Sequence, residues 1–421
     1  MSQWQVENYR AVFRNASFRR FWLGFTFSAV GDAMTRIALI WFVYQSTKSA
    51  QAVGILLLCY TGPVVIGGLF AGALLDRFDR RMVMLIDNVF RGVVVALVPL
   101  FYFSGHLALW HVYLVAGVYG CFMMISLAGG PSLIPGLVSQ SQLATANALE
   151  TLSYTISGVF GPPIAGLLIV RFGAPSVMII DACSYAAFAL ALARVDVKGE
   201  HEELARESKV VYRFRDAVSL VLRNRVLLST TLMFMLFNVG EGFLSVWLPL
   251  FAVQTLRGGP ELYGLLLGTL AGGEVIGSLL AGSLVFPLSL GALICLAQGL
   301  SGASLALLLL GPGIWWTVAG LALLGLFSAP LTIWAQTLRM KIIPERLRGR
   351  VFALLRTLMQ SSGPLASGGA GALLLMVGIP AMIGLSAVLV GLPGVFGYAV
   401  KQLRSPAEPA LAAKLEVVER S

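Results

Sequence analysis

Long apolar stretches separated by short polar loops are the feature that most limits how this chain can fold. Residues 82–103 and 379–402, for example, each span more than 20 residues and carry few charges. A helix needs about 20 apolar residues to cross a bilayer core, where every backbone polar group must be paired inside the structure. Charged residues make up 12% of the chain, whereas about 25% is usual in soluble globular proteins. The sequence therefore predicts an all-α membrane protein.

The apolar stretches predict twelve transmembrane helices in two groups of six. We expect the helices at residues 18–45, 52–75, 82–103, 110–137, 143–171, 175–194, 226–254, 261–284, 288–310, 314–340, 347–376 and 379–402. The hydrophilic break between the groups predicts a cytoplasmic linker with an amphipathic helix. The expected domains are a six-helix bundle at residues 1–194, the linker at 195–225, a second bundle at 226–402 and a cytoplasmic tail at 403–421.

Basic residues set the expected orientation. Most of the 30 Lys and Arg residues fall on one side of the predicted helices, in clusters such as residues 10–20, 77–81 and 339–350. Loops rich in Lys and Arg stay in the cytoplasm. Both termini are therefore expected to be cytoplasmic, in a plasma (bacterial inner) membrane. The formal net charge of +10 is explained by this topology, so no nucleic-acid partner is expected.

The two predicted bundles resemble each other in sequence. Residues 25–32 (FTFSAVGD) align with residues 234–241 (FMLFNVGE), and glycines at positions 54, 67 and 72 recur at 264, 277 and 282. Six helices return a chain to its starting side, so the two bundles should have the same orientation. This predicts a pseudo-twofold axis along the membrane normal, with a substrate site between the bundles near the midplane.

The loop at residues 72–81 (GALLDRFDRR) resembles the G-x-x-x-D-R-x-x-R-[RK] signature of the major facilitator superfamily. The resemblance implies that fold and transport by alternating access, with a cytoplasmic latch formed by Gly72, Asp76, Arg77 and Arg81. Gly72 is expected to allow close backbone approach. Alternatively, these charges serve only to set the topology.

A second segment, residues 157–166 (SGVFGPPIAG), resembles the antiporter signature of the same superfamily. A proline inside a helix removes a backbone hydrogen bond and bends the helix. The resemblance implies that Gly161, Pro162 and Gly166 form a bend that favours export with proton exchange. The alternative is a bent packing helix with no role in the mechanism.

Residues 31–54 and 74–92 most resemble the drug and macrolide efflux branch, which also contains siderophore exporters. The fourth predicted helix has no Lys or Arg, although a basic residue is common there in drug:proton antiporters. Their proton relay is therefore not carried over to this chain.

Charged residues inside the predicted helices are the main candidates for proton coupling. Asp32 and Arg36 stand one helical turn apart, and Asp87 and Arg91 repeat this spacing, which favours ion pairing. A charge at the bilayer centre costs at least about 2.5–3.5 kcal/mol, so such residues usually face a cavity or a partner. Asp32 and Arg36 either line a cavity or neutralise one another.

Glu241 occupies the position of Asp32 in the second bundle, and Ser245 replaces Arg36. Desolvation favours the protonated carboxyl and a bound cation favours the ionised one, so Asp32 or Glu241 would exchange a proton for substrate. The two acids are expected to face each other across the central cavity. Glu150 and Glu274 have either cavity or packing roles, and Asp181 is expected in an interfacial role near the outer end of its helix.

Several aromatic and methionine residues are possible pocket-lining groups, although most such residues in helices pack or face lipid. These candidates are Phe25, Met34, Trp41, Met123, Phe237, Trp247 and Trp334. The sequence has no G-x-x-x-x-G-K-[ST] motif, and its histidines form no metal-ligand grouping. No metal, cofactor or enzymatic activity is therefore expected.

The predicted function is export of amphipathic, drug- or antibiotic-like small molecules by alternating access in exchange for protons. The expected partners are the substrate, protons and the lipid bilayer, and a monomer is expected. One alternative is a dedicated exporter of an endogenous siderophore or lipid. A non-transporting membrane receptor and facilitated diffusion are the others.

Overall fold

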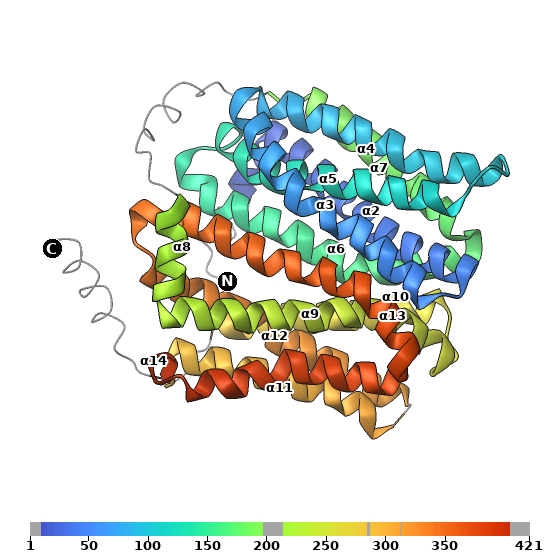
Figure 1. The fold of residues 1–421 in the computed structure, drawn as a ribbon. Helices are drawn as coiled ribbons and strands as arrows, with labels where there is room; N and C mark the ends of the chain where they lie inside the picture. The colour runs from blue at the N-terminus through green and yellow to red at the C-terminus, as the bar shows by residue number, and fades with distance from the viewer. Residues whose placement is uncertain (1–9, 197–213, 284–286, 312, 405–421) are drawn as a thin grey trace. The chain divides into compact units, whose positions relative to one another are not determined.

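The computed structural model describes residues 10–196, 214–283, 287–311 and 313–404 (Figure 1). Within these ranges the chain is helical and contains no strand. Ten of the described helices are long and apolar enough to cross a membrane. The predicted all-helical class is therefore confirmed, whereas the count of twelve helices and the pseudo-twofold axis stay predictions. Much of the predicted linker (197–213) and of the tail (405–421) lies outside the described residues.

The chain divides into two compact units, and unit 1 comprises Met1–Lys209 and Arg257–Gly268. Within it, α2 packs against α6 and α7, α4 packs against α5 and α7, and α3 packs against α5 (Figure 1). The helices of unit 1 are α2 (Ala16–Thr47), α3 (Ala50–Arg77), α4 (Arg80–Phe103), α5 (Leu109–Leu133), α6 (Leu143–Phe172) and α7 (Ala174–Ala193).

Unit 2 comprises Val210–Leu256 and Thr269–Ser421. In it, α9 packs against α13, and α11 packs against α12 and α13. Its helices are α8 (Phe214–Arg223), α9 (Arg225–Gln254), α11 (Leu290–Ala306), α12 (Ile314–Ile342), α13 (Glu345–Ala399) and α14 (Lys401–Arg404). Helix α10 (Pro260–Ser283) begins in unit 1 and ends in unit 2.

Helix α13 is interrupted at Gly378, where the backbone has a φ of 79° that glycine adopts readily. Its apolar part, Leu354–Ala399, has 46 residues. A straight helix of that length would extend about 69 Å, more than twice the roughly 30 Å hydrocarbon core. The interruption lies between the two helices that the sequence predicts at residues 347–376 and 379–402.

Polar side chains mark the starts of several helices. Asn15 caps α2 by accepting hydrogen bonds from the backbone N–H groups of Ser17 and Phe18, and its amide donates to the Leu137 carbonyl at 2.5 Å. Asp79 caps α4 by accepting from the Met82 N–H at 2.7 Å. Such caps satisfy the unpaired N–H groups of a first helical turn.

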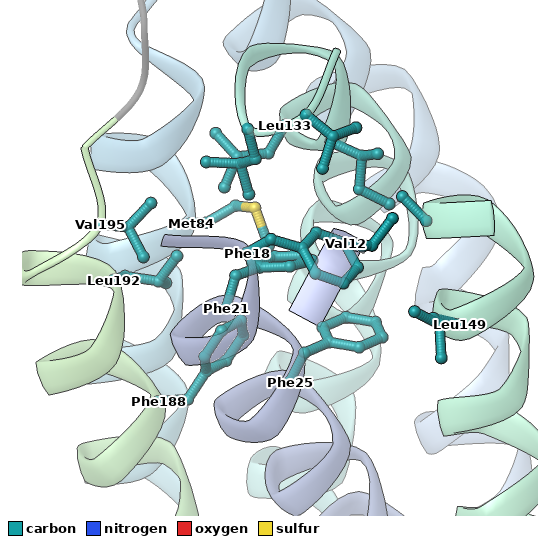
Figure 2. Close-up of a cluster of buried hydrophobic side chains, with 14 residues drawn as sticks. Val12, Phe18, Phe21, Phe25, Met84, Leu133, Leu149, Phe188, Leu192 and Val195 are labelled. Carbon is teal, nitrogen blue, oxygen red and sulfur yellow. The ribbon is translucent and has the colours of Figure 1, made fainter. Parts of the chain in front are cut away.

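A buried aromatic cluster fixes the first half of α2 inside unit 1 (Figure 2). Phe18, Phe21 and Phe25 follow one another at helical spacing and pack with Phe188 of α7 and Met84 of α4. The Phe21 and Phe25 rings stack with their centroids 5.6 Å apart. Asp32 lies two turns beyond this cluster, so the packing of the phenylalanines fixes the part of α2 that carries it.

Candidate functional site

An ion pair inside α4 is the centre of a polar network in unit 1. Arg91 Nη2 lies 2.6 Å from Asp87 Oδ2, and Arg91 Nε donates to both carboxylate oxygens at 3.1 and 3.2 Å. The side chain of Arg91 is only 1% exposed, and that of Asp87 is fully buried. The structure thus forms the pair that the i,i+4 spacing predicts.

Asp32 of α2 joins this pair instead of pairing with Arg36. Arg91 Nη1 lies 3.7 Å from Asp32 Oδ2, whereas Arg36 is exposed one turn away and forms no ion pair with a described residue. Arg91 is buried, and burying a charge costs less free energy when an opposite charge lies beside it. The suggested neutralisation of Asp32 by Arg36 is therefore replaced by an interhelical contact between α2 and α4.

Hydroxyl groups from two further helices complete the network. Tyr119 of α5 donates to Asp32 Oδ1 at 2.6 Å, and Tyr185 of α7 donates to the same oxygen. Tyr185 also accepts from Arg91 Nη1 at 2.9 Å. Ser126 of α5 accepts from Arg91 and donates to Asp87 Oδ2 at 3.1 Å. Sequence reasoning did not find these hydroxyl residues, because no spacing within one helix marks them.

Asp181 of α7 lies inside this region, which corrects its expected interfacial role. Its side chain is fully buried, and Ser184 donates to its Oδ1 at 3.1 Å. The charged residues whose fields act on it are Asp32 and Arg91. The burial arises because α7 packs against both α2 and α4.

The charges of this region do not balance. Asp32 and Asp87 contact the guanidinium of Arg91, and Asp181 is buried near enough to Asp32 and Arg91 to interact with both electrostatically. Arg36, exposed one turn from Asp32, is not part of this buried group of four. With every carboxyl ionised, the group would carry two negative charges in excess. Uncompensated charge is costly in a low-dielectric interior, so the arrangement is suited to holding protons.

Asp32 connects the network to a small cavity within unit 1. The cavity measures about 30 Å³, enough for about two water molecules at roughly 10–15 Å³ each. The side chain of Asp32 is 25% exposed, whereas those of Asp87 and Arg91 are buried. Phe25 and Phe188 belong to both the cavity wall and the aromatic cluster of Figure 2. The full lining is Phe25, Ser28, Ala29, Asp32, Met123, Ser126, Leu127, Tyr154 and Phe188.

The other predicted acids lie on other helices. Glu150 is buried in α6, where its Oε1 would lie 2.9 Å from a Cβ placed on Gly130 of α5. In unit 2, Glu241 is half-buried in α9. Glu274 is exposed in α10. The expectation that Asp32 and Glu241 share a central cavity stays a prediction.

The residues of the predicted latch have different surroundings in unit 1. Arg81 donates from Nε and Nη2 to the carbonyls of Leu192 and Ala193, each at 2.8 Å, at the end of α7 where the helix dipole favours a cation. Arg77 is exposed beside the Phe78 ring. A Cβ on Gly72 would meet no atom of the described residues within 4 Å, so the expected close backbone approach is not seen within the described part of the chain. The side chain of Asp76 lies outside the described residues.

The predicted helix-bend segment makes close contacts inside unit 1. Helix α6 continues through Pro162 and Pro163. A Cβ on Gly161 would lie 2.6 Å from Ala33 Cβ of α2, and one on Gly166 would collide with the Pro260 carbonyl of α10. These contacts explain the small residues as packing surfaces. The role of the bend in proton exchange stays a prediction.

The remaining aromatic and methionine candidates are mostly packing residues. Trp247 is fully buried in unit 2, and its Nε1 donates to Ser386 Oγ at 3.1 Å. Phe237 is buried in α9, Trp334 is half-buried in α12, and Met34 is buried in α2. Of the predicted lining residues, Phe25 and Met123 line the cavity beside Asp32.

Several known transporters are similar to this chain in sequence. A relative from Streptococcus pyogenes, macrolide efflux protein A, is 24% identical over 83% of this chain and 87% of its own. The multidrug efflux pump Tap of Mycolicibacterium fortuitum is 23% identical over 91% and 96%. A shorter match to the uncharacterized MFS-type transporter YfiS of Bacillus subtilis, 27% identical, spans 38% of this chain and 37% of that protein.

The fold is similar to that of solved transporters. The crystal structure of a mutant of the nucleoside transporter NupG superimposes with a TM-score of 0.72 at 13% identity, covering 92% of this chain and all of that one. The family model of the Major Facilitator Superfamily matches residues 21–367. The chain is an integral membrane protein with the predicted transporter fold, and it belongs to the Major Facilitator Superfamily.

Proposed function

We propose that this protein is a secondary active transporter that exports amphipathic small molecules by alternating access in exchange for protons. The observation that carries the proposal is the position of Asp32, which connects the buried Arg91 ion-pair network to a cavity. The cavity wall combines this carboxyl with apolar groups of Phe25, Met123 and Phe188. At about 30 Å³ this space holds water and not a substrate, because sites for drug-sized ligands measure about 300–1,000 Å³. The cavity must therefore widen in another conformation before the cationic group of an amphipathic molecule reaches Asp32.

The exchange follows from the two protonation states of Asp32. The ionised carboxylate accepts hydrogen bonds from Tyr119 and Tyr185 and lies beside Arg91. Protonation removes its charge and weakens its attraction both to Arg91 and to a cationic substrate. Proton binding and substrate binding at Asp32 therefore oppose each other, which makes the cavity release its substrate when a proton enters.

The names of the relatives support export of antibiotics, because two full-length matches are efflux proteins. We further propose that Glu241 acts as the second coupling carboxyl, with Glu150 and Glu274 as accessory acids. Gly72, Asp76, Arg77 and Arg81 act as the cytoplasmic latch, and Gly161, Pro162 and Gly166 act as the bend. The protein is proposed to be a monomer of the bacterial inner membrane, with both termini in the cytoplasm.

Reconstituted liposomes with an imposed pH gradient test the proposal. We expect wild-type protein to accumulate at least one member of a panel of rhodamine 6G, ethidium, erythromycin and siderophores. Asp32→Asn should abolish this uphill accumulation and leave the protein folded. Glu261→Gln is the matched control, because it neutralises an exposed acid at the start of α10.

Full accumulation by Asp32→Asn would remove Asp32 from the mechanism. Wild-type accumulation that ignores the pH gradient would contradict proton exchange. Competition restricted to the siderophores would instead indicate a dedicated exporter.

A further inference from the structure

Asp181 differs from the other two acids of the network in its partners. Asp87 and Asp32 share Arg91, at 2.6 and 3.7 Å. Among the described residues of unit 1, no Lys, Arg or His side chain forms an ion pair with Asp181. Asp181 is nevertheless fully buried, in the interior of a helix that is long and apolar enough to cross a membrane.

The hydrogen bonds of Asp181 suit a protonated carboxyl. Its Oδ1 accepts from Ser184 Oγ at 3.1 Å, but its Oδ2 has no hydrogen-bond partner among the described residues. The hydroxyl of Thr35, which also has none there, is a side-chain neighbour of the carboxyl from α2. An ionised carboxylate has about four acceptor positions to satisfy, and the described residues satisfy one of them in Asp181. A protonated carboxyl has fewer acceptor positions to satisfy and offers an O–H donor to a neighbouring hydroxyl.

The described helices around Asp181 leave it without a cation of its own. Helix α2 presents Asp32 and Thr35, and helix α4 presents Arg91, which is held by Asp87. The tyrosines near enough to interact electrostatically with it are Tyr60, Tyr119 and Tyr185. A second negative charge beside ionised Asp32 would be repelled by it.

We propose that Asp181 holds a proton in this conformation and is a further proton-exchanging residue of the network. This inference rests on the proposed proton exchange for its role in transport, but the proton on Asp181 is observable without any transport. In the exchange, the Asp181 O–H bond breaks and an O–H bond forms on Asp32. The negative charge moves from Asp32 to Asp181, and the Asp32–Arg91 attraction is lost. Asp32 then passes the proton to the cavity as the cationic group of the substrate binds beside it, and a later proton from the cavity returns to Asp181 through Asp32.

Infrared spectroscopy of the purified protein in lipid at neutral pH tests the proton directly. We expect a carboxylic-acid C=O band in the wild type that is missing from Asp181→Asn. The Ser184 hydroxyl shares its hydrogen between Asp181 Oδ1 at 3.1 Å and the Asp181 backbone carbonyl at 2.8 Å. Ser184→Ala removes this shared bond without removing a titratable group, so the same band should shift to higher frequency. If Asp181→Asn does not fold, the shift in Ser184→Ala still identifies the band.

An unchanged band in both variants would overturn the proposal. In liposomes, Asp181→Asn should move at least one proton fewer per transported substrate than the wild type, and Ser184→Ala should match the wild type. A wild type that moves no protons would contradict the proposed function and not the protonated state of Asp181. A wild type and an Asp181→Asn variant with equal proton counts would contradict only the role of Asp181 in exchange.

Discussion

Units 1 and 2 bury polar side chains in different ways. Unit 1 buries a titratable group of three carboxyls and one guanidinium. The buried bonds described in unit 2 are mostly between neutral groups, such as Gln298 to the Met233 carbonyl and Trp247 to Ser386. The two units therefore differ in the buried polar groups that are described, and the Arg91 network that we propose to exchange protons lies in unit 1.

Arg339 of α12 makes the contrast sharper, because it is a buried arginine of unit 2. It is 5% exposed, donates to the Thr230 carbonyl at 3.2 Å and lies over the Phe234 ring at 4.7 Å. No described carboxylate lies within 4 Å of it. A buried arginine with carboxylates and one without should respond differently to replacement.

The largest expected effect is the difference between Arg91→Met and Arg339→Met. Arg91→Met leaves Asp87 buried without its cation, which should lower the free energy of unfolding by about 3–5 kcal/mol. Among the described residues, Arg339→Met removes a hydrogen bond from a charged donor and no ion pair, so we expect a smaller loss of about 1.5–3 kcal/mol. Thermal unfolding in one detergent compares the two variants. Equal losses of stability would show that the carboxylates around Arg91 do not distinguish it from Arg339.

Replacing a closely packed glycine with alanine should give the next largest loss of stability. A Cβ on Gly31 would collide with Asp181 Oδ1, whereas one on Gly242 would lie 2.6 Å from the Gly363 carbonyl. Either alanine substitution should cost about 1–3 kcal/mol through overpacking. Only Gly31→Ala should also change the pH profile of transport, because it displaces a carboxyl. A changed profile in Gly242→Ala would contradict this assignment.

Replacing Tyr185 or Ser386, which bond other side chains, should give an effect of similar size to the glycine substitutions. Tyr185→Phe removes a donor to Asp32, and Ser386→Ala removes the acceptor of Trp247. Each should cost about 1–3 kcal/mol, because a buried partner is left unpaired. Tyr185→Phe also removes a hydrogen bond from the carboxyl that we propose to exchange protons, so the pH of half-maximal transport should shift. Initial transport rates across a pH series measure this shift, and Ser386→Ala should show none.

Ser367→Ala in unit 2 should have the smallest effect. Ser367 donates to the carbonyls of Gly242 and Gly363 at 3.1 and 3.0 Å. These carbonyls belong to helices, so the loss should be about 0.5–1.5 kcal/mol, with an unchanged pH profile. A measured loss above that range would show that this contact between α9 and α13 contributes more to unit 2 than its hydrogen bonds indicate.

The features that lie within a single helix could be predicted from the sequence. Hydropathy located the apolar helices, and the i,i+4 spacing predicted the Asp87–Arg91 pair. The partner of Asp32 could not be predicted, because contacts between helices depend on their relative rotation and depth. The same limit applies to Tyr119 and Tyr185, which meet Asp32 from different helices.

Sequence patterns also do not predict whether a side chain points into a cavity or packs against other helices. Met123 and Trp247 were equal candidates for the pocket, yet one lines a cavity and the other is fully buried. Both suit an apolar helix, so composition does not separate them. The burial of Asp181 had one available signal: it is an acid in the interior of an apolar stretch, where a charge is costly.

Proton release on substrate binding tests the central claim most directly. Weakly buffered protein in detergent, mixed with the panel compound that the wild type accumulates, should release protons to a pH-sensitive dye. Asp32→Asn should release fewer, and Glu261→Gln should match the wild type. Equal release by Asp32→Asn and the wild type, or no release by the wild type, would contradict proton exchange through the buried network of unit 1.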